Sequence, residues 1–206
     1  MSIIQTIKEN HPGLHKAIVL FLSQKIHPRP RIWTRWFVNP FFHKRGKGSR
    51  ICRKARMDVF PWRKFELGAG ALVEDFAVVN NGAGDVFIGA KSRIGIGSVV
   101  VGPVTIGERT SLGPHVHIVG FNHTFEDGDR DWNEQGLTFR PTTIGDECLI
   151  GANTSVVAGV TIGNRVQVGA GSVVTHDLPD ACVAVGNPAR VIKLYNRDTR
   201  VWERVS

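Results

Sequence analysis

The sequence of 206 residues is poor in cysteine and lacks a long hydrophobic run. Its three cysteines, Cys52, Cys148 and Cys182, lie far apart, without the close pairs that zinc sites and redox motifs use. We therefore expect free thiols and a reducing, cytoplasmic location. The longest apolar run near the N-terminus, 17–22, is far shorter than the roughly 20 residues that span a bilayer, and no cleavage pattern follows it. We expect neither a transmembrane helix nor a signal peptide.

Acidic residues are scarce at the N-terminal end. Residues 1–65 contain 15 Lys and Arg but only Glu9 and Asp58, a formal charge of +13, whereas the rest of the chain carries −5. The same segment holds nine of the 17 aromatic residues. This composition predicts a basic, aromatic N-terminal arm over 1–65, joined to a mildly acidic body. Apolar residues at helical spacing over 3–23, interrupted at 11–13, predict short helices in the arm.

Two interpretations of the arm remain open. Its Arg, Lys, Trp and Phe residues suit peripheral contact with an anionic membrane surface. Alternatively, most of the aromatic residues cover the end of the body while the basic residues are solvated, and we favour this second interpretation. No recognised nucleic-acid-binding motif accompanies the charge, so we do not expect a nucleic acid partner.

A repeat of six residues runs from residue 67 to residue 174. Its first position is aliphatic in all 15 copies, and glycine follows it in the first copy of every group of three but never in the third. A period of six nested in a period of 18 predicts that three short strands form one triangular coil, with the aliphatic side chain inside and glycine relieving the tight corner. The aliphatic positions are Leu67, Val73, Val79, Ile88, Ile94, Val100, Ile106, Leu112, Ile118, Ile144, Ile150, Val156, Ile162, Val168 and Val174.

The repeat predicts a mainly β protein, a single-stranded parallel β-helix of about five coils over residues 66–180, followed by a C-terminal segment over 181–206. It is interrupted by three residues at 85–87 and by 20 residues at 124–143, both after a third copy, so both insertions leave from one corner. A loop as long as 124–143 in a compact domain is more often functional than decorative. Cys148 falls at a small interior position, so we interpret it as a core residue and not as a nucleophile.

Several segments resemble the hexapeptide-repeat acetyltransferases, chiefly the branch with maltose, galactoside and capsular-polysaccharide O-acetyltransferases and the xenobiotic acetyltransferases. They are PTTIGDECLIGAN (141–153), GVTIGN (159–164), GAGSVVT (169–175) and GNPARVIK (186–193). The resemblance covers residues 66–195. It implies a left-handed coil, a homotrimer with active sites between neighbouring subunits, and acetyl transfer from acetyl-CoA to a hydroxyl of a sugar or surface-polysaccharide precursor.

By this resemblance, His123 matches the catalytic histidine of the family. It ends the third repeat of the third predicted coil, and the long insertion begins directly after it. An imidazole can accept the proton of an alcohol as the alcohol oxygen attacks a thioester, so His123 is expected to act as the general base. His115 and His117 are expected to be outward-facing surface residues.

The resemblance also implies where the coenzyme lies. Ala152 and Ala170 match small residues that line the pantetheine arm, and Thr175 and His176 match positions near that arm. No metal is expected.

Two basic residues follow the last coil. Arg190 and Lys193 match positions that meet the adenosine phosphates through charge-assisted contacts. The alternative is that both are solvated charges.

Candidates for acceptor binding are more weakly indicated. Glu134, in the insertion, would orient His123 or bind the acceptor, and a solvated carboxylate is the alternative. Asn122 adjoins His123, while Asn80 and Asn81 lie on the corner that later carries the insertion. Paired asparagines at a turn are also ordinary turn residues.

Two other functions are compatible with a β-helix of this kind. A γ-class carbonic anhydrase or related metal hydrolase would need three histidines around zinc, and none lies between His43 and His115. A non-catalytic scaffold would bind a partner on its flat faces, and would not bind coenzyme.

Overall fold

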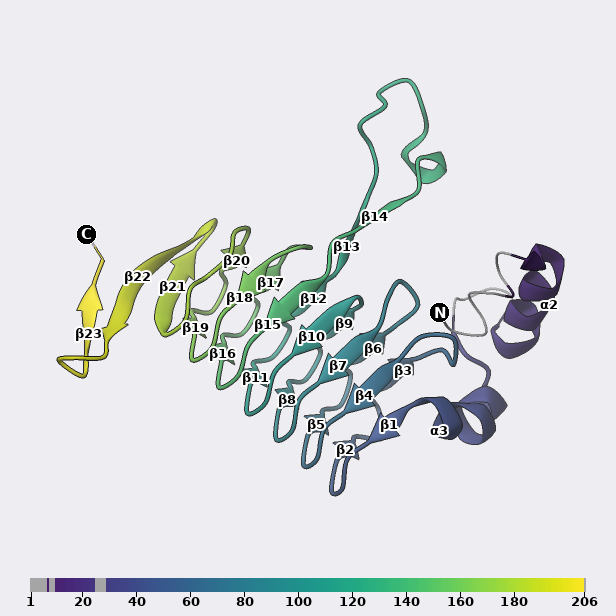
Figure 1. The fold of residues 1–206 in the computed structure, drawn as a ribbon, viewed down its shortest axis with the longest axis horizontal. Helices are drawn as coiled ribbons and strands as arrows, with labels where there is room; N and C mark the ends of the chain where they lie inside the picture. The colour runs from purple at the N-terminus through teal and green to yellow at the C-terminus, as the bar shows by residue number, and fades with distance from the viewer. Residues whose placement is uncertain (1–6, 8–9, 25–28, 206) are drawn as a thin grey trace.

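The computed structural model describes residues 7, 10–24 and 29–205, and most of this chain forms a parallel β-helix (Figure 1). Three sheets of short parallel strands form the faces of a triangular prism. The first face is built from β1 (Lys44–Arg45), β4 (Phe65–Leu67), β7 (Val86–Ile88), β10 (Val104–Ile106), β15 (Thr142–Ile144) and β18 (Thr161–Ile162). The second begins with β2 (Arg50–Ile51), β5 (Leu72–Val73), β8 (Arg93–Ile94), β11 (Ser111–Leu112), β16 (Leu149–Ile150) and β19 (Gln167–Val168). The third contains β3 (Arg56–Asp58), β6 (Val78–Asn80), β9 (Val99–Val101), β12 (His117–Val119), β17 (Ser155–Val156) and β20 (Val173–Val174).

The prism has six coils, one more than the repeat predicts. The additional coil, β1 to β3, lies inside the segment assigned to the arm, so the body begins near Lys44 and not at residue 66. Its residues Arg45, Ile51 and Met57 stand six apart and pair with the first three predicted repeat positions. Because Arg45 replaces an aliphatic residue, the pattern was hidden among basic residues.

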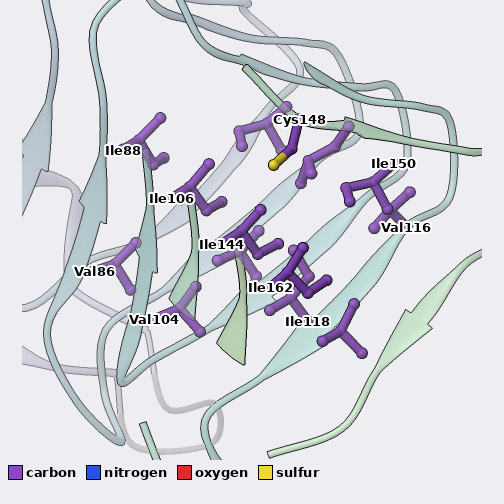
Figure 2. Packing of buried hydrophobic residues seen from close by; sticks show 14 of the residues in the cluster. Val86, Ile88, Val104, Ile106, Val116, Ile118, Ile144, Cys148, Ile150 and Ile162 are labelled. Atoms are coloured by element: carbon purple, nitrogen blue, oxygen red, sulfur yellow. The ribbon is translucent and has the colours of Figure 1, made fainter. Parts of the chain in front are cut away.

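The interior is filled by the predicted aliphatic residues (Figure 2). Ile88, Ile106, Ile144 and Ile162 come from successive strands of the first face and are at most 2% exposed. Cys148 is also buried, and its thiol donates a hydrogen bond to the carbonyl of Gly163, at 3.0 Å. Its assignment as a core residue is confirmed.

The glycines that follow the aliphatic residues are required by stacking between coils. A Cβ on Gly145 would lie only 2.7 Å from the carbonyl oxygen of Gly163 in the next coil. The left-handed backbone occurs two residues later, at Glu147 and Arg165, with φ of 57° and 56°. The glycines thus relieve close contact between stacked coils at the corner, as predicted, while the left-handed residue of the same corner is not a glycine.

The insertion forms an antiparallel hairpin that projects from the prism (Figure 1). Its strands are β13 (Phe121–His123) and β14 (Leu137–Phe139), and the 3₁₀-helix η2 (Trp132–Glu134) lies between them. The predicted bounds of both insertions shift, because Thr142 and Thr143 belong to β15 while 86 and 87 belong to β7.

The C-terminal segment extends the second face. β21 (Cys182–Gly186) adds a strand parallel to β19, and β22 (Ala189–Asn196) and β23 (Val201–Arg204) continue the sheet in antiparallel fashion.

In the described part of the arm, three short helical segments have defined bounds, and they lie beyond the N-terminal end of the prism (Figure 1). They are the α-helix α2 (Pro12–Leu22), the π-helix η1 (Thr34–Val38) and the α-helix α3 (Asn39–Phe42). The predicted interruption at 11–13 is the start of α2, and the apolar positions at 3–6 lie outside the described residues. None of the helices in the described part of the chain is long and apolar enough to cross a membrane.

Most aromatic residues of the arm do not pack against the prism. Phe60 and Phe65 are buried, but five of the nine aromatic side chains are exposed. The interpretation that most of them pack against the body was therefore wrong. The exposed five are Phe21, Trp36, Phe37, Phe41 and Phe42.

Candidate active site

The base of the hairpin is fixed firmly to the prism. The hydroxyl of Thr142, which is fully buried, donates to the carbonyl of Val119 at 2.7 Å and accepts a hydrogen bond from the backbone N–H of Gly159 at 3.1 Å. The N–H of Arg140 donates to the carbonyl of Gly120, at 2.8 Å. These bonds join the two ends of the insertion to the adjoining coil.

His123 stands on β13, opposite Leu137 of β14. Its exposed ring lies edge-on to Trp132, with ring centroids 5.1 Å apart, and 6.0 Å from the ring of Phe121. Neither ring nitrogen forms a hydrogen bond with any residue that the structure describes. The contacts therefore restrict the imidazole through its ring and leave its nitrogens accessible.

Glu134 does not make the predicted contact with His123. It ends η2, the helix that supplies Trp132, and its exposed carboxylate has no hydrogen bond to the imidazole. The residue that the structure brings against His123 is Trp132, which sequence reasoning missed. The available signal was that Trp132 is the one large apolar residue in the polar stretch 126–136. A role for Glu134 in binding an acceptor remains a prediction.

The predicted asparagines differ in their surroundings. Asn81 is completely buried, and its side chain bonds to Phe60 and Arg63 of the preceding coil, so it is not available to an acceptor. Asn80 accepts a hydrogen bond from the N–H of Gly82, at 2.6 Å, which is the turn role that paired asparagines usually have. Asn122 is exposed next to His123 and remains a candidate.

A groove of about 610 Å³ begins at the base of the hairpin. Its lining includes Phe139, two residues from the partner of His123 on β14, together with Thr175 and His176. The hydroxyl of Thr175 lies 2.8 Å from Nδ1 of His176. The structure thus brings Thr175 and His176 to the same corner of the prism as His123, here called the hairpin corner.

The other predicted coenzyme residues lie at a second corner. Ala152 and Ala170 follow β16 and β19, stacked in successive coils, and we call this the alanine corner. Arg190 lies near the same corner. It pairs with Val185, close to the C-terminal end of β21, and β21 runs parallel to β19 towards the alanine corner. Lys193 lies further back along β22, opposite Val183. A single chain therefore does not bring Ala152 and Ala170 to His123.

Two further histidines lie in or next to β12, outside the hairpin. His115 and His117 are exposed, as expected. In the described ranges, no three His, Cys, Asp or Glu side chains come together as metal ligands.

Two family models match the prism. Residues 85–120 match the bacterial transferase hexapeptide (six repeats), and residues 141–176 match the hexapeptide repeat of succinyl-transferase. The matched segments flank the hairpin on both sides.

Curated relatives carry acetyltransferase names. The chain is 37% identical over 108 residues to the putative lipopolysaccharide biosynthesis O-acetyl transferase WbbJ of Escherichia coli (strain K12), covering 49% of this chain and 55% of that protein. It is 40% identical over 93 residues to the galactoside O-acetyltransferase of the same organism, covering 45% of each. The chain thus spans about half the length of these relatives.

A solved structure supports the fold. The N-acyltransferase AntD from Bacillus cereus, in complex with dTDP and 3-hydroxybutyryl-CoA, superposes with a TM-score of 0.67 at 22% identity, covering 80% of this chain and 90% of that one. At this identity the likeness concerns the left-handed β-helix alone. The family models and the curated relatives together show that the prism consists of hexapeptide repeats and that the chain is similar to hexapeptide-repeat acetyltransferases.

Proposed function

We propose that the protein transfers an acetyl group from acetyl-CoA to a hydroxyl of a sugar or surface-polysaccharide precursor, with His123 as the general base. The observation that carries this proposal is the exposed imidazole at the base of the hairpin, on the same hairpin whose Phe139 lines the groove towards Thr175 and His176. The names of the curated relatives support the acyl group and the class of acceptor.

The reaction is a direct transfer. One ring nitrogen of His123 takes the proton of the acceptor hydroxyl while the hydroxyl oxygen attacks the thioester carbonyl carbon. The tetrahedral intermediate then collapses, the carbon–sulfur bond breaks, and the proton passes from the imidazolium to the sulfur. The products are an acetyl ester and free CoA, and no covalent enzyme intermediate is formed.

The coenzyme would lie between two copies of the chain. The alanine corner offers small side chains for close approach of the pantetheine arm, and Arg190 and Lys193 offer positive charge for phosphates. His123 lies at a different corner, so we propose a homotrimer in which the alanine corner of one subunit faces the hairpin corner of the next. The reaction is placed in the cytoplasm, where acetyl-CoA is available.

The test is release of CoA thiol by the purified protein with acetyl-CoA and a panel of sugars and nucleotide sugars. His123→Ala should lower the rate by at least about a hundredfold while acetyl-CoA affinity changes little. His117→Ala is a matched control, because this exposed histidine lies outside the groove and should leave the rate unchanged. Unchanged turnover in His123→Ala rejects the base assignment.

Treatment of the acetylated product with mild base separates the two acceptor chemistries. An acetyl ester is cleaved, whereas an N-acetyl amide survives. An amide product would show that the acceptor group is an amine and not a hydroxyl. No CoA binding and no turnover with any acceptor would favour a non-catalytic scaffold.

A further inference from the structure

The helical segment 34–42 of the arm, formed by η1 and α3, packs against the rest of the protein through polar side chains. Thr34 and Asn39 are its buried residues, at 0% and 5% exposed. The hydroxyl of Thr34 donates to the carbonyl of Leu22 at 2.9 Å, and the amide of Asn39 donates to the carbonyl of Val59 at 2.7 Å. These two bonds determine which side of the segment faces inwards.

The outward side of the same segment is aromatic. Trp36, Phe37 and Phe41 are 74%, 73% and 86% exposed, and Phe42 is 53% exposed. A surface helix of a soluble protein ordinarily buries its apolar side and exposes its polar side. This segment does the reverse, and a cluster of exposed large apolar side chains of this kind marks an interaction surface.

The neighbouring helix α2 is apolar as well. Its 11 residues include only one charged residue, Lys16, and none of them is buried. Leu14, Leu20 and Phe21 are 47–67% exposed, and the ring of Phe21 packs on Trp33 at 5.0 Å. Both helical elements therefore offer apolar side chains at the same end of the molecule (Figure 1).

The charged residues of segment 29–57 are all basic. Residues 29–57 contain ten Lys and Arg and no Asp or Glu. Arg29 and Arg56 bind Asp58, and Lys44 binds Glu66, but Arg35 and Arg45 have no acidic partner among the described residues. A cationic region beside exposed aromatic side chains is complementary to a surface of anionic lipid headgroups over a hydrocarbon layer.

We propose that this surface, formed by Trp36, Phe37, Phe41 and Phe42 with Arg35 and Arg45, docks the protein on an anionic membrane. The aromatic rings enter the headgroup region and the guanidinium groups meet lipid phosphates or carboxylates. α2 lies along the interface, because 11 helical residues rise only about 17 Å and do not span a bilayer. Docking does not depend on the proposed acetyl transfer.

The experiment is co-sedimentation of the full-length protein with vesicles of phosphatidylcholine, with and without about a third of phosphatidylserine. The protein should bind the anionic vesicles at least about tenfold more tightly than the neutral ones, and high salt should weaken binding. Phe37→Ser/Phe41→Ser should lose at least about tenfold. Each of Arg35→Gln and Arg45→Gln should lose roughly fivefold. Brominated lipids should quench the fluorescence of the wild type more than that of Trp36→Phe.

Two matched variants control for general effects of the substitutions. Phe125→Ser removes an aromatic side chain that is 71% exposed in the hairpin, and Arg204→Gln removes an exposed charge at the opposite end of the chain. Neither should change vesicle binding. Equal binding to neutral vesicles, no binding at all, or equal losses in the control variants would overturn the proposal.

Two other occupants are distinguishable from a membrane. A shift of Phe37→Ser/Phe41→Ser to a smaller oligomer, with vesicle binding intact, would show that a second copy covers the surface. Displacement of the protein from vesicles by short single-stranded RNA, with tighter RNA than lipid binding, would assign the surface to nucleic acid. Either result refutes the membrane assignment.

Discussion

The imidazole of His123 and the indole of Trp132 meet nearly at right angles, with an interplanar angle of 87° and ring centroids 5.1 Å apart. The two residues come from different parts of the hairpin, β13 and η2. Since the imidazole forms no hydrogen bond to a described residue, this contact and the one with Phe121 are what restrict the ring. Trp132 is thus a positioning residue for the proposed base.

Trp132→Ala should lower kcat by about tenfold, because the imidazole would sample orientations unsuited to proton transfer. The KM for acetyl-CoA should be nearly unchanged. Trp132→Phe retains an aromatic face and should recover most of kcat. Steady-state kinetics of both variants checks this, and a rise in acceptor KM at constant kcat would instead make the indole a platform for the acceptor.

The buried amide of Asn81 should matter for stability. Its oxygen accepts from the N–H of Phe60 at 2.6 Å, and its nitrogen donates to the carbonyls of Phe60 and Arg63 at 3.1 Å each. Asn81→Ala would leave the buried N–H of Phe60 unpaired, although the carbonyl of Phe60 keeps its hydrogen bond from His43, at a cost of about 1–3 kcal/mol in the free energy of unfolding. Denaturant titration measures this.

Asn80→Ala is the control for Asn81, because it removes only the local bond to Gly82 and should cost at most about 1 kcal/mol. A loss of acceptor affinity in Asn81→Ala at unchanged stability would restore Asn81 as a binding residue.

The sequence was sufficient for the prism but not for its start. The six-residue repeat placed the core correctly, since each aliphatic residue occupies an equivalent position in every coil. The repeat could not be recognised at Arg45, where a charged residue occupies a repeat position in the first coil of the β-helix. The site was harder to predict because the contact of His123 with Trp132 depends on how the insertion folds, and the insertion has no repeat pattern. The separation of Ala152 from His123, in contrast, follows directly from the repeat, because Ala152 follows a second copy and His123 follows a third copy, so the two residues occupy different corners.

The three cysteines should react at different rates. Burial raises the pKa of the Cys148 thiol, and burial together with Cys148 raises the pKa of Cys182 to about 11. Both thiols are therefore protonated and shielded at pH 8, whereas Cys52 is partly exposed. A disulfide reagent should titrate one thiol rapidly in the native protein and three in denaturant. Cys52→Ser should remove the rapid reaction, and rapid labelling that persists in this variant would contradict the assignment.

His43 should make folding sensitive to mild acid. Its ring donates from Nε2 to the carbonyl of Phe60 at 3.0 Å, and burial lowers its pKa below the ordinary value of 6.5. The unfolded chain then binds this proton more readily than the folded protein, so the stabilising contribution is present above about pH 6.5 and declines as the pH falls below it.

Denaturant titrations at pH 7.5 and 5.5 test this contribution. The wild type should lose more stability between these two conditions than His43→Gln, which carries no proton-binding ring. Equal losses would show that His43 titrates alike in both states.

The bonds of Thr142 have a consequence for how related enzymes diversify. They connect the coils beneath the hairpin, so the coils on either side keep their stacking whatever the length or composition of the inserted hairpin. Substitutions and insertions between β13 and β14 thereby change the surroundings of His123 and leave the bonds that hold the prism together in place. Under the proposed function, the choice of acceptor and the thermodynamic stability of the prism are consequently separable traits.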